Sequence, residues 1–97
     1  MSIIFEWDDK KAAENQGKHG VSFEEAQAVF ADDSALLICD PDHSNDEERF
    51  ILLGLSAGLR ILVVCHCYRK SDETIRIISA RKATAKERRQ YLERLKR

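Results

Sequence analysis

The sequence predicts an α+β protein with a small, largely antiparallel sheet flanked by two N-terminal helices and a C-terminal helix. Short runs rich in β-branched and aromatic residues, which are typical of strands, recur along the chain. Segments with helical spacing follow the first run and also end the chain. The remaining runs succeed one another across turn-forming residues, as in antiparallel hairpins. We therefore expect the order β-α-α-β-β-β-β-α in a single domain, residues 1–97, since single domains commonly reach about 100–150 residues.

A strand at residues 3–7 and a short helix open the chain. Asp8 is a candidate N-cap, because its carboxylate can accept hydrogen bonds from the free amides of a helix that starts at Lys10. The helix is expected to end at about Gln16, because Gly17 and Gly20 enclose a turn.

The second helix is predicted from capping-box spacing. Ser22 can reach forward to a backbone amide while Glu25 reaches back, and the helix then continues to about residue 31. Phe23, Ala26 and Phe30 fall at helical spacing and form its inner face.

Four further strands are predicted at residues 36–39, 49–53, 60–68 and 74–79. The Ser-Ala-Gly turn at 56–58 joins two of them in an antiparallel hairpin, and the apolar run up to His66 marks a central strand.

The C-terminal helix is predicted to start at a second capping box, Thr84 with Glu87. Tyr91, Leu92 and Leu95 give it a narrow apolar stripe.

Charge is distributed unevenly along the chain. The net charge is −1, but residues 1–59 carry four basic and thirteen acidic side chains (−9), whereas residues 60–97 carry twelve basic and four acidic ones (+8). Such a chain can present a positive face to a polyanion. The three cysteines, an odd number, favour a reducing compartment, and the apolar N-terminal run is too short for a signal peptide. We expect a cytoplasmic protein without a membrane partner.

The last strand and its exit concentrate arginine. Alternation puts Arg76 on one face, while Arg81 and Lys82 leave the end of the strand. Guanidinium groups suit phosphate because their paired donors match two phosphate oxygens. A solvated or salt-bridged surface is the alternative interpretation.

Histidine supplies the candidates for proton transfer. His66 interrupts an apolar strand, with Arg69 just beyond, and an imidazole near neutrality can transfer a proton during phosphodiester cleavage. The alternative is a hydrogen-bonded core histidine. His19 beside Lys18 is a second candidate, while His43 in a polar loop is better explained as structural.

A metal site has weak support. Cys65 and Cys67 flank His66, and Cys39 or His43 would have to complete the ligands, but no second pair at zinc-finger spacing exists. We expect neither a metal nor another cofactor.

Several separated blocks of the sequence resemble the BrnT family of bacterial toxins. They are Phe-Glu-Trp-Asp at residues 5–8, Lys-His-Gly-Val-Ser-Phe-Glu-Glu-Ala at 18–26, Asp-His-Ser at 42–44 with Glu-Arg at 48–49, the segment 76–84, and Glu-Arg-Arg-Gln-Tyr at 87–91. The resemblance implies a type II toxin with a RelE-like fold, a ribonuclease that blocks translation. It also implies an antitoxin with a ribbon-helix-helix part, through which the complex contacts operator DNA.

Together these observations predict a metal-independent endoribonuclease. Arg76 and Arg81, assisted by Arg69, are expected to hold phosphate, and His66 or His19 to transfer the proton. Further RNA contacts are expected from five basic residues: Lys18, Lys82, Lys86, Arg88 and Arg89. The alternative is a non-catalytic binding module whose basic face docks a partner protein or a nucleic acid.

Overall fold

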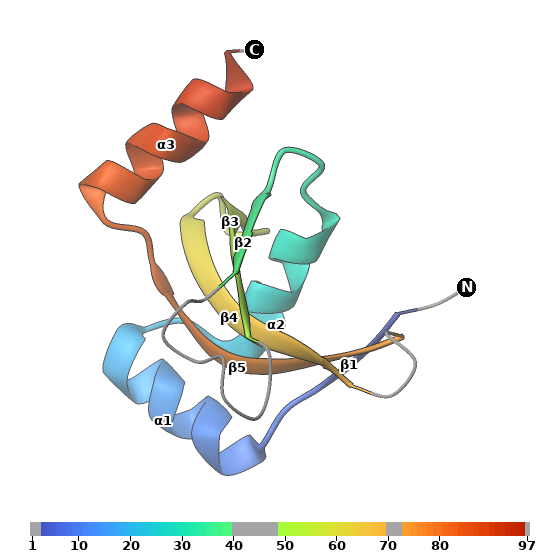
Figure 1. Ribbon diagram of the computed structural model, residues 1–97. Coiled ribbons are helices and arrows are strands. Elements are labelled where there is room, and N and C mark those ends of the chain that lie inside the picture. The colour runs from blue at the N-terminus through green and yellow to red at the C-terminus, as the bar shows by residue number, and fades with distance from the viewer. Residues whose placement is uncertain (1–2, 40–48, 70–72, 97) are drawn as a thin grey trace.

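The fold is a five-stranded sheet with helices on both faces, seen in a computed structural model that describes residues 3–39, 49–69 and 73–96 (Figure 1). In chain order the elements are β1 (Ile4–Glu6), α1 (Asp9–His19), α2 (Phe23–Gln27), the 3₁₀ helix η1 (Ala28–Ala31), β2 (Leu36–Cys39), β3 (Phe50–Leu55), β4 (Ile61–Arg69), β5 (Thr74–Lys82) and α3 (Ala85–Leu95). None of the helices in these described ranges is long and apolar enough to cross a membrane.

The sheet is mixed, which corrects the prediction of a largely antiparallel one. Its strand order is β1-β5-β4-β3-β2, and β2 to β5 pair antiparallel with their sequence neighbours. β1, however, runs parallel to β5, pairing Ile4 with Thr74 and Glu6 with Arg76. Turn-forming residues between neighbouring strands indicate hairpins, but they do not indicate whether the first strand of the chain pairs with the last one.

The first helix is longer than predicted. The Asp8 carboxylate accepts from the Lys10 amide at 2.9 Å, so the predicted N-cap is confirmed. The helix passes Gly17 and ends only at Gly20, whose positive φ of 69° is the conformation that glycine adopts without strain.

The helix arrangement also differs from the predicted one in its second member. α2 is only five residues long and tightens into the 3₁₀ helix η1. The Ser22 hydroxyl accepts from the Glu25 amide at 3.0 Å, as predicted. The Glu25 carboxylate does not complete the capping box, because it accepts hydrogen bonds instead from Ser56 and Arg60 in the turn between β3 and β4.

One face of the sheet, the closed face, is covered by α1, α2 and η1. The core between them consists of Val21, Phe23, Ala26, Val29, Leu52, Leu62, Val64, Ile77 and Ala80. Gly54 on β3 allows close approach, because a Cβ there would lie 2.9 Å from side-chain atoms of Val29 and Ala35.

The opposite face, the open face, is covered by α3 only in part. The predicted capping box of Thr84 and Glu87 is confirmed, and Tyr91 is buried against Leu53 and Val63. The predicted apolar stripe is wrong beyond Tyr91, since about half of each Leu92 and Leu95 side chain is exposed. Figure 1 shows α3 extending from the sheet on the side away from α1.

A buried asparagine continues the sheet edge where β1 ends. Past Arg76, α1 flanks β5, and the Asn15 side chain accepts from the Ala80 amide at 3.1 Å. The same side chain donates to the carbonyl oxygens of Ala80 and Val21 at 2.8 and 3.0 Å. Asn15 thus satisfies backbone groups of Ala80 that a longer β1 would have paired.

Candidate nucleic-acid interface

A β-bulge in β5 brings two predicted phosphate-binding arginines to the same face. Arg76 pairs with Cys67 and Arg81 with Val63, and these partners lie four residues apart on β4. Because side chains alternate along a strand, Cys67 and Val63 share a face, and so do the two arginines. The register shift leaves Ile78 as the extra residue. Both arginines therefore lie on the open face, roughly 13 Å apart along the strand.

The structure corrects the prediction for this segment. Regular alternation would have placed Arg76 and Arg81 on different faces, and both Arg81 and Lys82 were expected to leave the strand. β5 instead continues to Lys82. Lys82 pairs with Leu62 and therefore lies on the closed face, away from Arg81.

Arg69 joins the same face and shares a carboxylate with Arg76. Arg69 is two residues beyond Cys67 on β4 and therefore points to the open face. The Glu6 carboxylate on β1 lies 2.8 Å from an Arg76 Nη atom and 3.7 Å from Arg69 Nε. All three side chains are about one third or more exposed. A phosphate arriving from solvent can therefore reach both guanidinium groups.

Arg81 has a carboxylate partner of its own. Its two terminal nitrogens donate to the two Glu87 oxygens at 2.8 and 3.0 Å, in a bidentate pair. This hydrogen bonding lowers the pKa of Glu87 to about 2 and raises that of Arg81. Glu87 also accepts from the Thr84 amide at 2.8 Å, so one carboxylate both caps α3 and binds the arginine.

His66 lies on the closed face and has no solvent-exposed surface. Its ring is packed among Phe30, Phe50 and Tyr68, with centroid distances of 4.8, 6.1 and 5.4 Å. Nδ1 is 3.3 Å from the Val64 carbonyl oxygen, and Nε2 has no hydrogen bond among the described residues. Burial lowers the pKa of His66. The core-histidine interpretation thus fits this geometry, in which the ring cannot contact a phosphate.

His19 and Lys18 lie at the edge of β5 rather than beside the arginines. They line a shallow groove of about 330 Å³ with Ile78, Ser79 and the helix residues Lys11, Glu14 and Asn15. Ser79 pairs with Cys65 on the open face, so the groove leads from the end of α1 toward the arginines.

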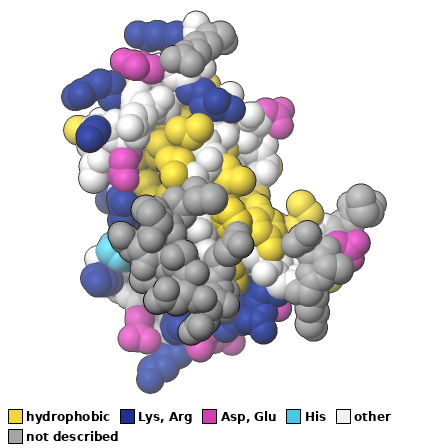
Figure 2. Space-filling model, viewed as in Figure 1, with side chains coloured by type: hydrophobic (Ala, Val, Ile, Leu, Met, Phe, Trp, Pro, Cys, Tyr) yellow, Lys and Arg dark blue, Asp and Glu magenta, His cyan; other side chains and the backbone are white. Residues whose placement is uncertain are grey.

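The other predicted RNA contacts divide between two places. Lys86 is exposed on the first turn of α3, beside Glu87. Lys82, Arg88 and Arg89 instead line a separate, wider groove next to α3. The view in Figure 2 shows Lys and Arg side chains over α3, with a band of hydrophobic side chains below them.

His66 cannot share a metal site with Cys65 and Cys67. Strand alternation puts His66 on the closed face, while Cys65 and Cys67 point to the other. His43 lies outside the described residues. Over 3–39, 49–69 and 73–96, no group of three or more His, Cys, Asp or Glu side chains could hold a metal ion.

Sequence reasoning missed the two carboxylates of the site. Glu6 had a visible signal, since it stands in the Phe-Glu-Trp-Asp block, and Glu87 was explained only as a capping residue. Their pairing with arginines depends on the β1–β5 register and on the position of α3, neither of which local patterns reveal.

Comparison with known proteins agrees with the resemblance seen in the sequence. Residues 7–87 match the family described as "Ribonuclease toxin, BrnT, of type II toxin-antitoxin system". Among solved structures, the crystal structure of the Brucella abortus ribonuclease toxin BrnT is similar, with a TM-score of 0.60 and 29% sequence identity. The alignment covers 87% of this chain and 97% of that one. A search of curated proteins gives no significant match.

The family match spans most of the chain, and the similar crystal structure extends the agreement to the fold. This chain belongs to the BrnT family of ribonuclease toxins of type II toxin-antitoxin systems.

Proposed function

We propose that this protein is a metal-independent endoribonuclease that cleaves RNA on the open face of its sheet and inhibits translation. The observation that carries the proposal is the bulge at Ile78, which gathers Arg76 and Arg81 with Arg69 on one accessible face. Three guanidinium groups there can bind successive phosphates and stabilise charge that develops on the phosphoryl oxygens. A RelE-like ribonuclease acting in the cytoplasm fits this arrangement.

The 2′-hydroxyl next to the scissile phosphate is the nucleophile in this proposal. Its oxygen forms a bond to phosphorus, its proton passes to a base on the protein, and the P–O5′ bond breaks as the leaving oxygen gains a proton. The products are a 2′,3′-cyclic phosphate and a 5′-hydroxyl. RNA phosphate would replace Glu6 on Arg76, which leaves the Glu6 carboxylate beside the phosphate as the base. His19, at the groove beside Ser79, is the candidate acid.

Lys18 and Lys86 are proposed to extend the RNA contact on either side of the arginines. Both are exposed, Lys18 at the end of α1 and Lys86 at the start of α3. Such contacts would add affinity without sequence preference, since they address only the phosphates.

Product analysis with labelled RNA in the presence of a chelator tests the proposal. We expect cyclic-phosphate ends from the wild-type protein and a rate reduced by about 10²–10³ in Arg81→Ala. Stability should fall by less than about 1 kcal/mol, because the lost ion pair is partly exposed. Lys10→Ala, an equal change of charge on α1, should cleave at the wild-type rate.

Two outcomes would contradict the proposal. Folded Arg81→Ala that cleaves at the wild-type rate removes Arg81 from the site. Tight RNA binding by the wild-type protein without any cleavage favours the non-catalytic binding module instead.

The type II family implies an antitoxin, and we propose that its DNA-binding part is a ribbon-helix-helix. In that arrangement the toxin contacts operator DNA only through the antitoxin, and the complex represses its own operon. Reconstituting the complex on operator DNA, with and without this chain, tests the assignment.

A further inference from the structure

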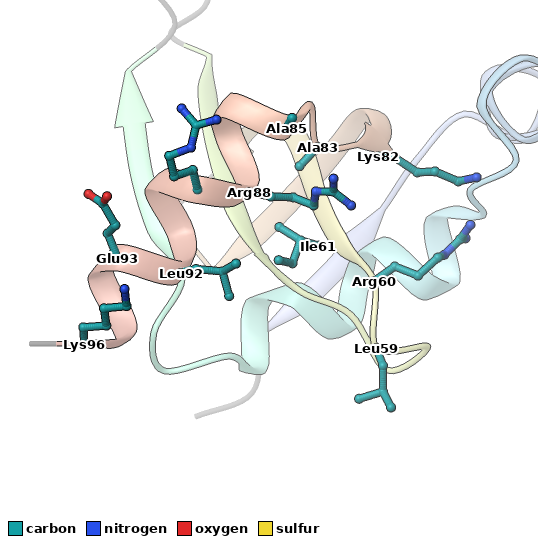
Figure 3. A pocket seen from close by; sticks show the side chains of 11 residues that line it. Leu59, Arg60, Ile61, Lys82, Ala83, Ala85, Arg88, Leu92, Glu93 and Lys96 are labelled. Atoms are coloured by element: carbon teal, nitrogen blue, oxygen red, sulfur yellow. The ribbon is translucent and has the colours of Figure 1, made fainter.

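The wide groove beside α3 combines positive charge with exposed apolar side chains. It has a volume of about 1060 Å³ and lies between α3, the β3–β4 turn and the end of β5 (Figure 3). Five basic side chains and one acidic one, Glu93, line it; the basic ones are Arg60, Lys82, Arg88, Arg89 and Lys96. The groove therefore favours an acidic occupant.

The apolar side chains of the groove stand on two separate elements. Leu59, at the β3–β4 turn, is 80% exposed, and Leu92 on α3 is 49% exposed. In Figure 3 Leu92 points from α3 toward the strands, beside Ile61. Because Tyr91 is the buried residue of α3, Leu92 is left to face the groove. Large apolar side chains that line a groove are typical anchors for a partner protein.

The backbone at Leu59 adds weight to this interpretation. Leu59 has a φ of 62°, a left-handed conformation that glycine or asparagine adopts more easily than leucine. The turn therefore keeps an exposed leucine where a smaller residue would fit with less strain. Packing within the chain does not explain this choice, since four fifths of the side chain faces solvent.

We propose that this groove binds an acidic segment of the antitoxin that carries spaced apolar side chains. The proposal rests on the toxin-antitoxin function given above. The basic rim would pair with the acidic groups of the segment, while Leu59 and Leu92 would contact its apolar ones. RNA fits less well, because its phosphates would interact with the basic side chains but not with the exposed leucines.

The groove lies beside α3 and does not include the proposed catalytic residues. Neither Arg81 nor Glu87 lines it, and Arg69 and Arg76 lie at the other end of the strands. Changes to its leucines should therefore alter antitoxin binding without altering RNA cleavage.

The test measures binding of the purified full-length toxin to the protein encoded by the neighbouring open reading frame, by isothermal titration calorimetry. Leu59→Asn with Leu92→Gln removes both anchors, and asparagine suits the left-handed turn. We expect Kd to rise by about 30-fold with the rate of RNA cleavage unchanged. Leu95→Gln is the matched control, because Leu95 is equally exposed but does not line the groove. It should change Kd by less than about 2-fold.

A charge variant provides an independent measurement. Arg88→Glu should weaken antitoxin binding and reduce its dependence on salt. Circular dichroism and thermal melting establish that each variant is folded.

Wild-type Kd in the double leucine variant would overturn the proposal. A loss of RNA cleavage with unchanged antitoxin affinity would overturn it too, and would show that the groove holds RNA. If the wild-type protein cleaves no RNA, the ribonuclease function is wrong, while the calorimetric comparison still decides the role of the groove.

Discussion

The same strands form both faces of the sheet, but one face is a buried core and the other carries partly exposed charged side chains. On the closed face, β4 and β5 contribute Val64, His66 and Ile77 to a core that excludes solvent. On the open face, they contribute Arg69, Arg76 and Arg81, which remain partly exposed. His66, the stronger histidine candidate in the sequence, is thus buried, whereas the three arginines on the other face are accessible to solvent. Accessibility, not residue type, distinguishes the face that we propose contacts RNA.

The two faces also differ in how their polar side chains are paired. The open face holds its charged groups as ion pairs, Glu6 with Arg76 and Glu87 with Arg81, each open to competition from phosphate. The closed face satisfies a backbone edge with a neutral amide, Asn15, which is buried. Removing the side chain that satisfies buried backbone groups should therefore cost stability on the closed side, whereas removing an arginine should mainly cost activity on the open side.

The largest effect on stability is expected for Asn15→Leu. The variant leaves the amide and carbonyl of Ala80 and the carbonyl of Val21 without their side-chain partner. We expect a loss of about 2–4 kcal/mol in the free energy of unfolding, measured by urea denaturation. Gln16→Leu, an exposed position on the same helix, should change it by less than about 0.5 kcal/mol. Equal losses in both variants would mean that Asn15 does not hold the edge.

A smaller, pH-dependent effect is expected for Glu87→Gln. Because the pKa of Glu87 is lowered from 4.5 to about 2 in the folded state, its ion pair stabilises the protein above pH 4.5. That stabilisation is lost as the pH falls through 2. The pair is partly exposed, so we expect a difference of about 1 kcal/mol between wild type and variant at pH 6.

Acid titration of the unfolding free energy measures this difference. It should shrink steadily between pH 4.5 and 2. A difference that stays constant with pH would show that the charge of Glu87 does not contribute to stability.

The smallest effect is expected for His66→Phe. Phenylalanine can take the place of the ring between Phe30 and Phe50, and it removes a buried Nε2 that has no hydrogen bond among the described residues. We expect the free energy of unfolding to change by less than about 1 kcal/mol and RNA cleavage to stay within 2-fold of wild type. A folded variant without activity would return His66 to the catalytic site and overturn the contrast between the faces.

Local features of the fold were predictable from the sequence. Asp8, Ser22 and Thr84 accept the hydrogen bonds expected of N-caps, because capping depends on residues only two or three positions apart. The β3–β4 hairpin was predicted for the same reason, from a short turn between two apolar runs.

Features that depend on distant segments were not predictable. The parallel pairing of β1 with β5 joins residues about seventy positions apart, and no local pattern encodes it. Periodicity divided β4 into two faces but could not tell which one the helices cover, so the burial of His66 was not predicted. The sequence predicted Arg76 and Arg81 as phosphate-binding residues, but their common face could be seen only from the register of β4 and β5.

The bulge at Ile78 makes the length of β5 as important as its composition. Deleting Ile78 itself would remove the bulge and leave Arg76 and Arg81 four residues apart, still on the same face. A one-residue deletion between them that kept the bulge would instead turn Arg81 toward the closed face while Arg76 stayed in place. Such a deletion would replace no charged residue, yet it would divide the positive charge between two sides of the molecule. Insertions and deletions in this strand should therefore be tolerated only where they keep both arginines on the open face.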